Sequence, residues 1–89
     1  MRISCQPTPN VHALKFTLDR RVTEGRSKTY TSVEQAKDEP LARTLLEIPG
    51  VRMVFLLNDF ITVTRDPSAD WEAIVPEVER RLRAHFGEE

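Results

Sequence analysis

Cys5, His12 and His85 are the side chains of this sequence best suited to bind a soft metal or to act as a nucleophile and base. They are the single cysteine and the two histidines of the chain. A structural zinc or iron–sulfur site takes about four such ligands from one chain, so three separated residues do not form one. Cys5 and His12 could pair for nucleophilic catalysis, but neither an oxyanion-binding segment nor a glycine-rich loop accompanies them. The sequence therefore predicts no metal site, no bound cofactor and no catalytic activity.

The carboxylates do not predict a catalytic site either. The 14 acidic residues lie at predicted helix ends and on solvated faces, whereas catalytic carboxylate pairs need burial to shift their pKa values. A weaker possibility is a small-anion site formed by Thr8, Asn10 and Lys15, because loop amides and a lysine can hold a phosphate group. Nothing in the spacing of these residues requires such a site.

Charge and hydropathy restrict the partners. The chain has 13 basic against 14 acidic residues and a pI near 6.1, so it lacks the basic field that nucleic acid or an anionic membrane attracts. No apolar run approaches the roughly 20 residues of a membrane span, and the N-terminal residues lack a signal-like apolar stretch. We expect a cytoplasmic, monomeric protein whose partner is another protein.

The hydrophobic pattern predicts a ββαββα order of elements. An alternating strand at His12–Asp19 and a short polar strand at Ser27–Thr31 precede a helical turn at 33–37 and a helix at 40–47. Two apolar runs, Val51–Leu57 and Phe60–Arg65, flank Asn58-Asp59 as a hairpin, and Asp70 caps a last amphipathic helix. The expected fold is a two-layer α+β domain in which both helices pack on one face of a four-stranded, mainly antiparallel sheet. Residues 1–89 form one domain, with 1–8 flexible and 87–89 a frayed tail.

The uncovered sheet face is the predicted binding surface. If Val51 begins the buried set of its strand, strict alternation exposes Arg52, Val54 and Leu56. Val54, Leu56 and Phe60 would form an apolar patch with a rim of Lys15, Arg52 and Thr62, which is typical of a protein-binding site. An inner strand covered by its neighbours is the alternative. The basic run Arg80–Arg83 could likewise meet an acidic partner or form a solvated helix face.

Several stretches together resemble the N-terminal domain of Nfu/NifU-type iron–sulfur cluster scaffold proteins. The similar segments are Thr8-Pro-Asn10, Leu14-Lys-Phe16, Pro40-Leu-Ala42, Ile48-Pro-Gly-Val51, Val54-Phe55 and Asp59-Phe-Ile-Thr-Val-Thr64, followed by Trp71 and Pro76. The resemblance implies the same ββαββα module, which in that family precedes a domain with a cluster-binding Cys-x-x-Cys motif. This sequence has no Cys-x-x-Cys, so the resemblance does not carry scaffold activity over to it. The family often has a proline after Thr-Pro-Asn where this chain has Val11.

Three functions follow as hypotheses. The first is a non-catalytic interaction module accessory to iron–sulfur cluster assembly or delivery, docking on a scaffold, carrier or client protein. The second is a metal or cluster carrier that dimerises through Cys5, and the third is a binder of a small anionic ligand at Thr8, Asn10 and Lys15.

Overall fold

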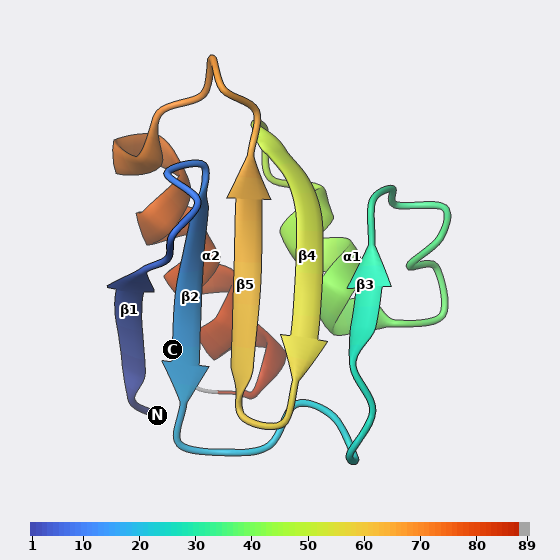
Figure 1. The fold of residues 1–89 in the computed structure, drawn as a ribbon. Coiled ribbons are helices and arrows are strands. Elements are labelled where there is room, and N and C mark those ends of the chain that lie inside the picture. The colour runs from blue at the N-terminus through green and yellow to red at the C-terminus, as the bar shows by residue number, and fades with distance from the viewer. Residues whose placement is uncertain (88–89) are drawn as a thin grey trace.

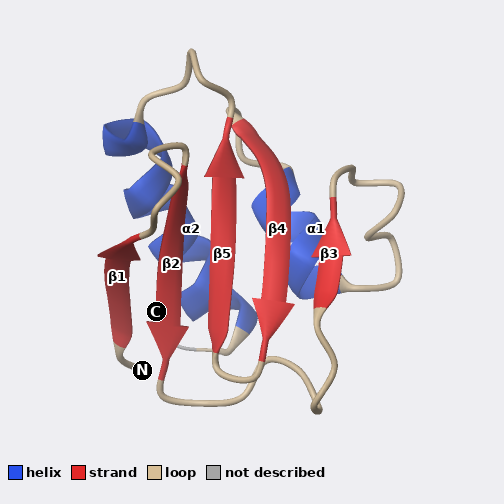
Figure 2. Ribbon diagram, in the orientation of Figure 1, coloured by secondary structure: helices blue, strands red, loops and turns tan. Residues whose placement is uncertain are grey.

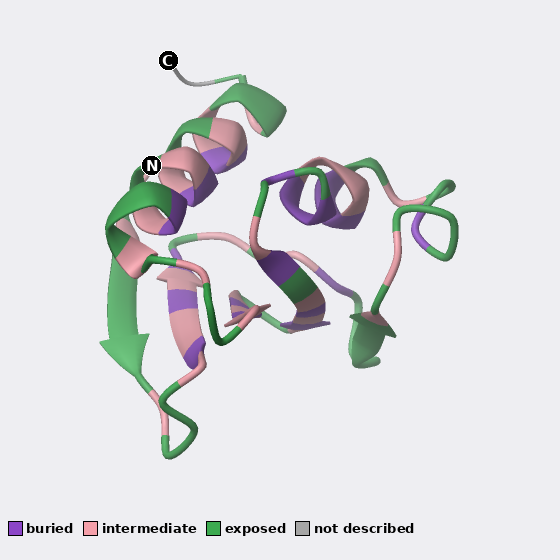
Figure 3. Ribbon diagram, turned by 90° about the horizontal axis from the view of Figure 1, so that it is seen from above, coloured by how far each residue is buried: buried purple, intermediate pink, exposed green. Residues whose placement is uncertain are grey.

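The computed structural model describes residues 1–87 and shows a five-stranded antiparallel sheet with two helices on one face (Figures 1 and 2). The sheet order is β1-β2-β5-β4-β3. Its elements are β1 (Ile3–Pro7), β2 (Ala13–Leu18), β3 (Lys28–Tyr30), α1 (Pro40–Leu46), β4 (Val51–Leu57), β5 (Phe60–Arg65) and α2 (Trp71–His85). Both helices lie on the same side of the sheet when it is seen along its strands (Figure 3). The predicted two-layer α+β arrangement is confirmed.

The strand count differs from the prediction of four. Residues 3–7, which we expected to be flexible, form β1 and pair with β2 along their whole length, from Ile3 opposite Leu18 to Pro7 opposite Leu14. Their side chains are mostly exposed, so the hydrophobic pattern carried little signal for this edge strand. Of the predicted frayed tail at 87–89, residues 88 and 89 lie outside the described residues.

The helix boundaries follow the local capping signals. Pro40 begins α1, where a missing backbone N–H costs nothing. The Asp70 carboxylate accepts a hydrogen bond from the Glu72 backbone N–H at 2.9 Å and caps α2, as predicted. Ahead of α1, the Gln35 N–H donates to the Ser32 hydroxyl, which holds the predicted helical turn.

The core lies between the helices and one face of the sheet. Its fully buried side chains come from both layers: Phe16, Leu45, Val54, Leu56, Ile61, Val63, Ile74, Val78 and Leu82. Phe16, Ile61 and Val63 alternate along β2 and β5 as predicted, so the opposite face of these two strands carries Lys15, Thr62 and Phe60.

The predicted orientation of β4 is wrong. Val54 and Leu56, expected to face solvent, are 0% exposed and pack under the helices. The cause is a β-bulge: Val51 lies opposite Arg65 and Met53 opposite Thr64, so Arg52 is one extra residue on β4. A one-residue insertion moves every following side chain to the other face. Met53, Phe55 and Leu57 therefore point away from the helices.

Candidate functional site

The bulge gives the uncovered sheet face a set of apolar side chains different from the predicted one. We define the open-face patch as Met53, Phe55, Leu57 and Phe60, all of which are partly exposed. The rings of Phe55 and Phe60 lie 6.1 Å apart between centroids at an interplanar angle of 40°. Partly exposed aromatic side chains in contact are the kind of group that dominates protein interfaces.

Polar groups border the patch on the neighbouring strands. The Lys15 Nζ lies 4.3 Å from the centroid of the Phe60 ring, a cation–π contact. Thr62 on β5 lies opposite Phe55 on β4 and opposite Lys15 on β2. Thr17 on β2 pairs with Phe60, and Thr29 on β3 pairs with Phe55 on β4. The arrangement is an apolar centre with one ammonium group and several hydroxyls around it.

Of the six residues predicted for partner binding, the structure brings Lys15, Phe60 and Thr62 together on the open face. Val54 and Leu56 are part of the core. Arg52 is exposed, and its Nε donates to the Asp66 carboxylate at 2.9 Å. Hydrogen bonds from Ser68 and from Arg52 lower the pKa of that carboxyl well below its usual range. Arg52 is thus engaged in a loop contact rather than in the patch rim.

A cross-strand signal in the sequence would have found the missing patch residues. In a two-residue hairpin, the residues on either side of the turn pair directly and lie on the same face. Leu57 and Phe60 flank Asn58-Asp59 and do pair in the structure, where Asn58 takes the positive φ of 53° that the turn needs. Placing Phe60 on the open face therefore requires Leu57, and with it Phe55, to lie there too.

The anion site at Thr8, Asn10 and Lys15 stays a prediction, and the structure shows the contacts that its three side chains make within the protein. The Thr8 hydroxyl lies within hydrogen-bonding distance of the carbonyl oxygens of Asn10 (2.9 Å) and Ala13 (3.0 Å), and it accepts from the Asn10 N–H. The Asn10 side-chain oxygen accepts from the His12 N–H at 2.9 Å. Both polar side chains therefore hold their own loop, while the Lys15 ammonium lies over the Phe60 ring.

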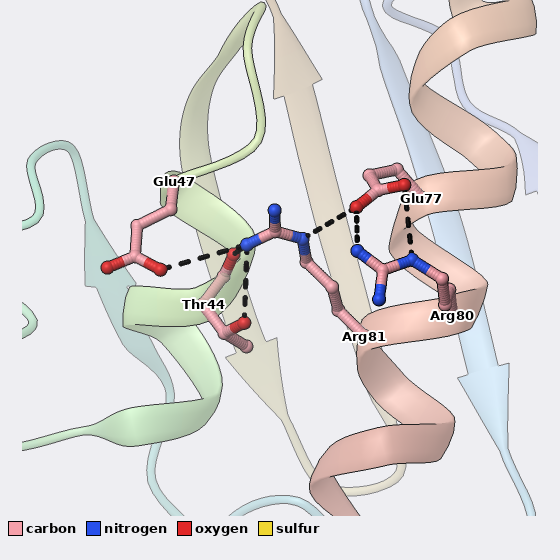
Figure 4. A network of polar contacts seen from close by, with 5 residues as sticks. All are labelled: Thr44, Glu47, Glu77, Arg80 and Arg81. Carbon is pink, nitrogen blue, oxygen red and sulfur yellow. Dashed lines mark hydrogen bonds and ion pairs between the residues drawn. The ribbon is translucent and has the colours of Figure 1, made fainter. Parts of the chain in front are cut away.

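A polar network joins the two helices on the other side of the molecule (Figure 4). The Arg81 Nη1 donates to the Thr44 carbonyl at 2.9 Å, near the end of α1, and the Arg81 Nε donates to Glu77 at 3.0 Å. Arg80 also bonds the Glu77 carboxylate, and Glu47 lies 3.7 Å from Arg81. Arg81 thus supplies a cation and donors where α1 leaves unpaired carbonyl groups.

This network predicts a pH dependence of stability. Hydrogen bonds from Arg80 and Arg81 lower the pKa of Glu77 from 4.5 to about 2. Because the folded state holds this proton more weakly than the unfolded state, the contribution is complete above pH 4.5 and is lost as the pH falls towards 2. We expect the difference in urea midpoint between the wild type and Glu77→Gln to shrink across that interval. A difference that stays constant from neutral pH to pH 2 would contradict the assignment.

Three comparisons with known proteins identify the family. The family model described as "Scaffold protein Nfu/NifU N terminal" matches residues 3–89. The human protein "NFU1 iron-sulfur cluster scaffold homolog, mitochondrial" is 40% identical over 87 residues, covering 97% of this chain and 34% of the human one. The crystal structure of SAV1430 from Staphylococcus aureus is similar with a TM-score of 0.82 at 34% identity, covering 92% of this chain and 99% of that one. This chain belongs to the Nfu/NifU N-terminal family.

Membership of the Nfu/NifU N-terminal family confirms the resemblance derived from the sequence. The chain spans 20% to 34% of the length of the first curated relatives it matches, among them "NifU-like protein 4, mitochondrial" of Arabidopsis thaliana at 37% identity over 88% of this chain and 28% of that protein. The human and Arabidopsis proteins are named as mitochondrial, so a cytoplasmic location for this chain stays a prediction. Within residues 1–87, no helix is long and apolar enough to cross a membrane.

Cys5 is the residue on which the carrier hypothesis depends. In the described part of the chain, no group of three or more His, Cys, Asp or Glu side chains is arranged to hold a metal ion. Cys5 is the middle residue of the edge strand β1, and burial together with the nearby Glu79 carboxylate raises the pKa of its thiol. Metal binding needs the thiolate, which a raised pKa disfavours. Neither observation favours the carrier hypothesis over the docking hypothesis.

Proposed function

We propose that this domain is a non-catalytic interaction module that docks on a protein of the iron–sulfur cluster assembly system through the open-face patch. The observation that carries the proposal is the contact group of Phe55 and Phe60 on the sheet face away from the helices, with the Lys15 ammonium over the second ring. Apolar anchors with a polar border are the usual composition of a protein-binding surface.

The energetic case rests on the aromatic side chains. Burying an exposed phenylalanine stabilises a complex by roughly 1.5–3 kcal/mol before the cost of ordering is subtracted. Two such rings in contact, with Met53 and Leu57 beside them, form a compact anchor. Lys15 would steer the partner and favour one that presents an acidic group beside its apolar surface.

The class of partner is inferred from the relatives. Several are named as iron–sulfur cluster scaffold homologs, and this chain corresponds to about a third of the human one. A module that binds rather than assembles is consistent with a domain whose cysteine and histidines are not grouped within residues 1–87. Its target would be a scaffold, carrier or client protein that handles the cluster.

The proposal is tested by affinity capture from native extract with the variant Phe55→Glu. The wild type is expected to enrich iron–sulfur assembly proteins, and the variant to lose at least about 10-fold of that enrichment, because a central anchor is replaced by a charge that must be desolvated. The substituted side chain lies outside the core, so the circular dichroism spectrum and melting temperature should change little.

Val33→Glu is the matched control. Val33 is 39% exposed and lies in the loop before α1, so the same charge is introduced on an exposed apolar residue away from the patch. It should capture the same proteins as the wild type. Equal capture by folded Phe55→Glu would rule out the patch as the docking surface.

A further inference from the structure

The outer edge of β1 is a place where a further strand can join the sheet. β1 is the outermost strand, and within residues 1–87 only β2 pairs with it (Figure 1). The opposite edge strand, β3, is three residues long and carries Lys28, whose ammonium lies 3.1 Å from Glu39. β1 is five residues long and contains no charged side chain. Short length and charge are two common protections of an edge against pairing, and β1 has neither.

The hydrogen bonds of β2 show which of its residues bond to β5. The His12 carbonyl accepts from the Arg65 N–H, and the Leu18 N–H donates to the Asp59 carbonyl. Both pairs continue the register of β2 with β5. In an antiparallel ladder, a residue directs its N–H and C=O to the same side, and successive residues alternate. The even-numbered residues of β2 therefore bond to β5, and the odd-numbered ones bond to β1.

This alternation determines which backbone groups of β1 face outwards. Ser4 and Gln6 lie opposite odd-numbered residues of β2 and bond to them, so Ile3, Cys5 and Pro7 direct their backbone groups away from the sheet. Pro7 agrees with this phase, because a missing N–H is tolerated where it would face solvent. Within residues 1–87, no hydrogen bond reaches the backbone groups of Ile3 or Cys5. Each of these two residues leaves one donor and one acceptor for a further strand.

A second copy of β1 matches these groups. In an antiparallel pair with Ile3 opposite Cys5 of the second copy, each such pair exchanges both of its hydrogen bonds. The two-fold axis generates the pair twice, so every free donor and acceptor of both residues is satisfied. The register with Cys5 opposite Cys5 would instead set Ile3 against Pro7, which has no N–H to donate. The first register places Ser4 opposite Ser4 of the second copy, on the axis.

Charge does not oppose this pairing. When an edge strand pairs with its own copy, like charges often come to lie opposite each other, which is destabilising, but β1 has none. The whole chain carries a formal net charge of −1, so the repulsion between two copies is small. On the adjacent α2, Glu79 acts on the Cys5 thiol and Arg83 donates to the Met1 carbonyl at 2.9 Å, so both signs of charge lie beside the edge. These features favour a second copy as the occupant.

We propose that two copies of this chain associate through antiparallel pairing of their β1 strands, with Ile3 of each opposite Cys5 of the other. The two sheets would join into one, with the helices of both copies on the same face. The open-face patch lies on β4 and β5 and stays uncovered, so this proposal does not depend on the proposed function. The contact is small, so the monomer predicted from the sequence would be the form at low concentration.

The test is sedimentation equilibrium from about 10 µM to about 1 mM protein, where the wild type should form a dimer with a dissociation constant of about 0.1–1 mM. Cys5→Pro removes the outward N–H and should remain monomeric throughout, while its pairing with β2 is retained. Cys5→Ser keeps the backbone N–H and should dimerise within about 2-fold of wild type, which separates the backbone from the thiol.

Disulfide trapping tests the register, and it does not depend on the folding of Cys5→Pro. In a Cys5→Ser background, Ser4→Cys places the two new thiols in a directly opposed pair, and oxidation with diamide should give a covalent dimer. Gln6→Cys in the same background is the matched control on the same face of β1. Its two thiols would lie four residues apart along the strands, about 14 Å, and should stay reduced.

Four outcomes would overturn the proposal. The first is a wild type that sediments as a monomer at about 1 mM. Loss of the dimer in Cys5→Ser would assign the association to the thiol, and its loss in folded Phe55→Glu would assign it to the open-face patch. Equal trapping at positions 4 and 6 would mean that the strands meet without the defined register.

Discussion

Replacing Leu56 with aspartate is expected to leave the domain unfolded in native buffer. Leu56 is 0% exposed and packs with Val54, Ile61 and the helices in one core cluster. Truncating a buried leucine costs roughly 2–5 kcal/mol, and an unpaired buried carboxylate adds several more. A domain of this length has a total stability of about 5–10 kcal/mol, so the sum consumes it.

Leu57→Asp is the matched control, since the same substitution is made one residue along the same strand. Leu57 belongs to the open-face patch, so its aspartate would remain in water and cost about 1 kcal/mol. Circular dichroism and urea denaturation of the pair measure the difference. Unfolding by Leu57→Asp with a folded Leu56→Asp would show that the bulge at Arg52 is misplaced and that β4 presents its other face to the helices.

Gly50→Ala is expected to destabilise the domain by roughly 3 kcal/mol, and to lower its melting temperature by roughly 15 °C. Gly50 has a φ of +94°, which costs an alanine about 1 kcal/mol. A Cβ at this position would also lie 2.7 Å from the Ala69 Cβ and 3.3 Å from the Ile74 Cδ1. Relieving that overlap would move the loop before α2 away from the start of β4, at a further cost of about 1–3 kcal/mol.

Gly25→Ala separates the two causes. Gly25 has a similar φ of +86°, and a Cβ there would meet no atom within 4 Å. It should lose about 1 kcal/mol through backbone strain alone. Thermal unfolding of both variants isolates the steric part as their difference. Similar melting temperatures would mean that the approach of Ala69 to Gly50 is not close.

Contacts of Gly50 also help to fix the position of the open-face patch. The Asp66 N–H donates to the Gly50 carbonyl at 2.7 Å, which joins the start of β4 to the end of β5. Arg52 follows two residues later as the bulge and is held by the Asp66 carboxylate. These contacts fix the register of the β4–β5 hairpin, and this register places Phe55 on the open face and Leu56 in the core.

Local signals in the sequence were sufficient for most elements. Pro40, Asp70 and the Asn58-Asp59 pair mark boundaries because each satisfies a backbone requirement of a helix start or a tight turn. β1 was missed because its residues are mostly exposed and it is held in the sheet by its pairing with β2. An edge strand with few buried side chains leaves little periodicity to detect.

The site was predicted in part for a related reason. Lys15, Thr62 and Phe60 lie on strands with a clear two-residue alternation, so their face could be read from the sequence. Val51–Leu57 is apolar at nearly every position, so both phases of alternation gave a plausible buried set. The polar network between the helices brings Arg81 to Thr44, 37 residues away in the chain, and no local sequence pattern predicts such a contact.

By itself the sequence determined the α+β class, the two helices, the hairpin and the family, because caps, turns and hydrophobic periodicity act over a few residues. The alternation within Val51–Leu57 left the buried side of β4 undecided, and the pairing of β4 with β5 decided it, because one extra residue at Arg52 reverses the strand relative to β5. Tertiary structure alone brought Arg81 of α2 against Thr44 and Glu47, since this contact depends on the packing of α1 on α2.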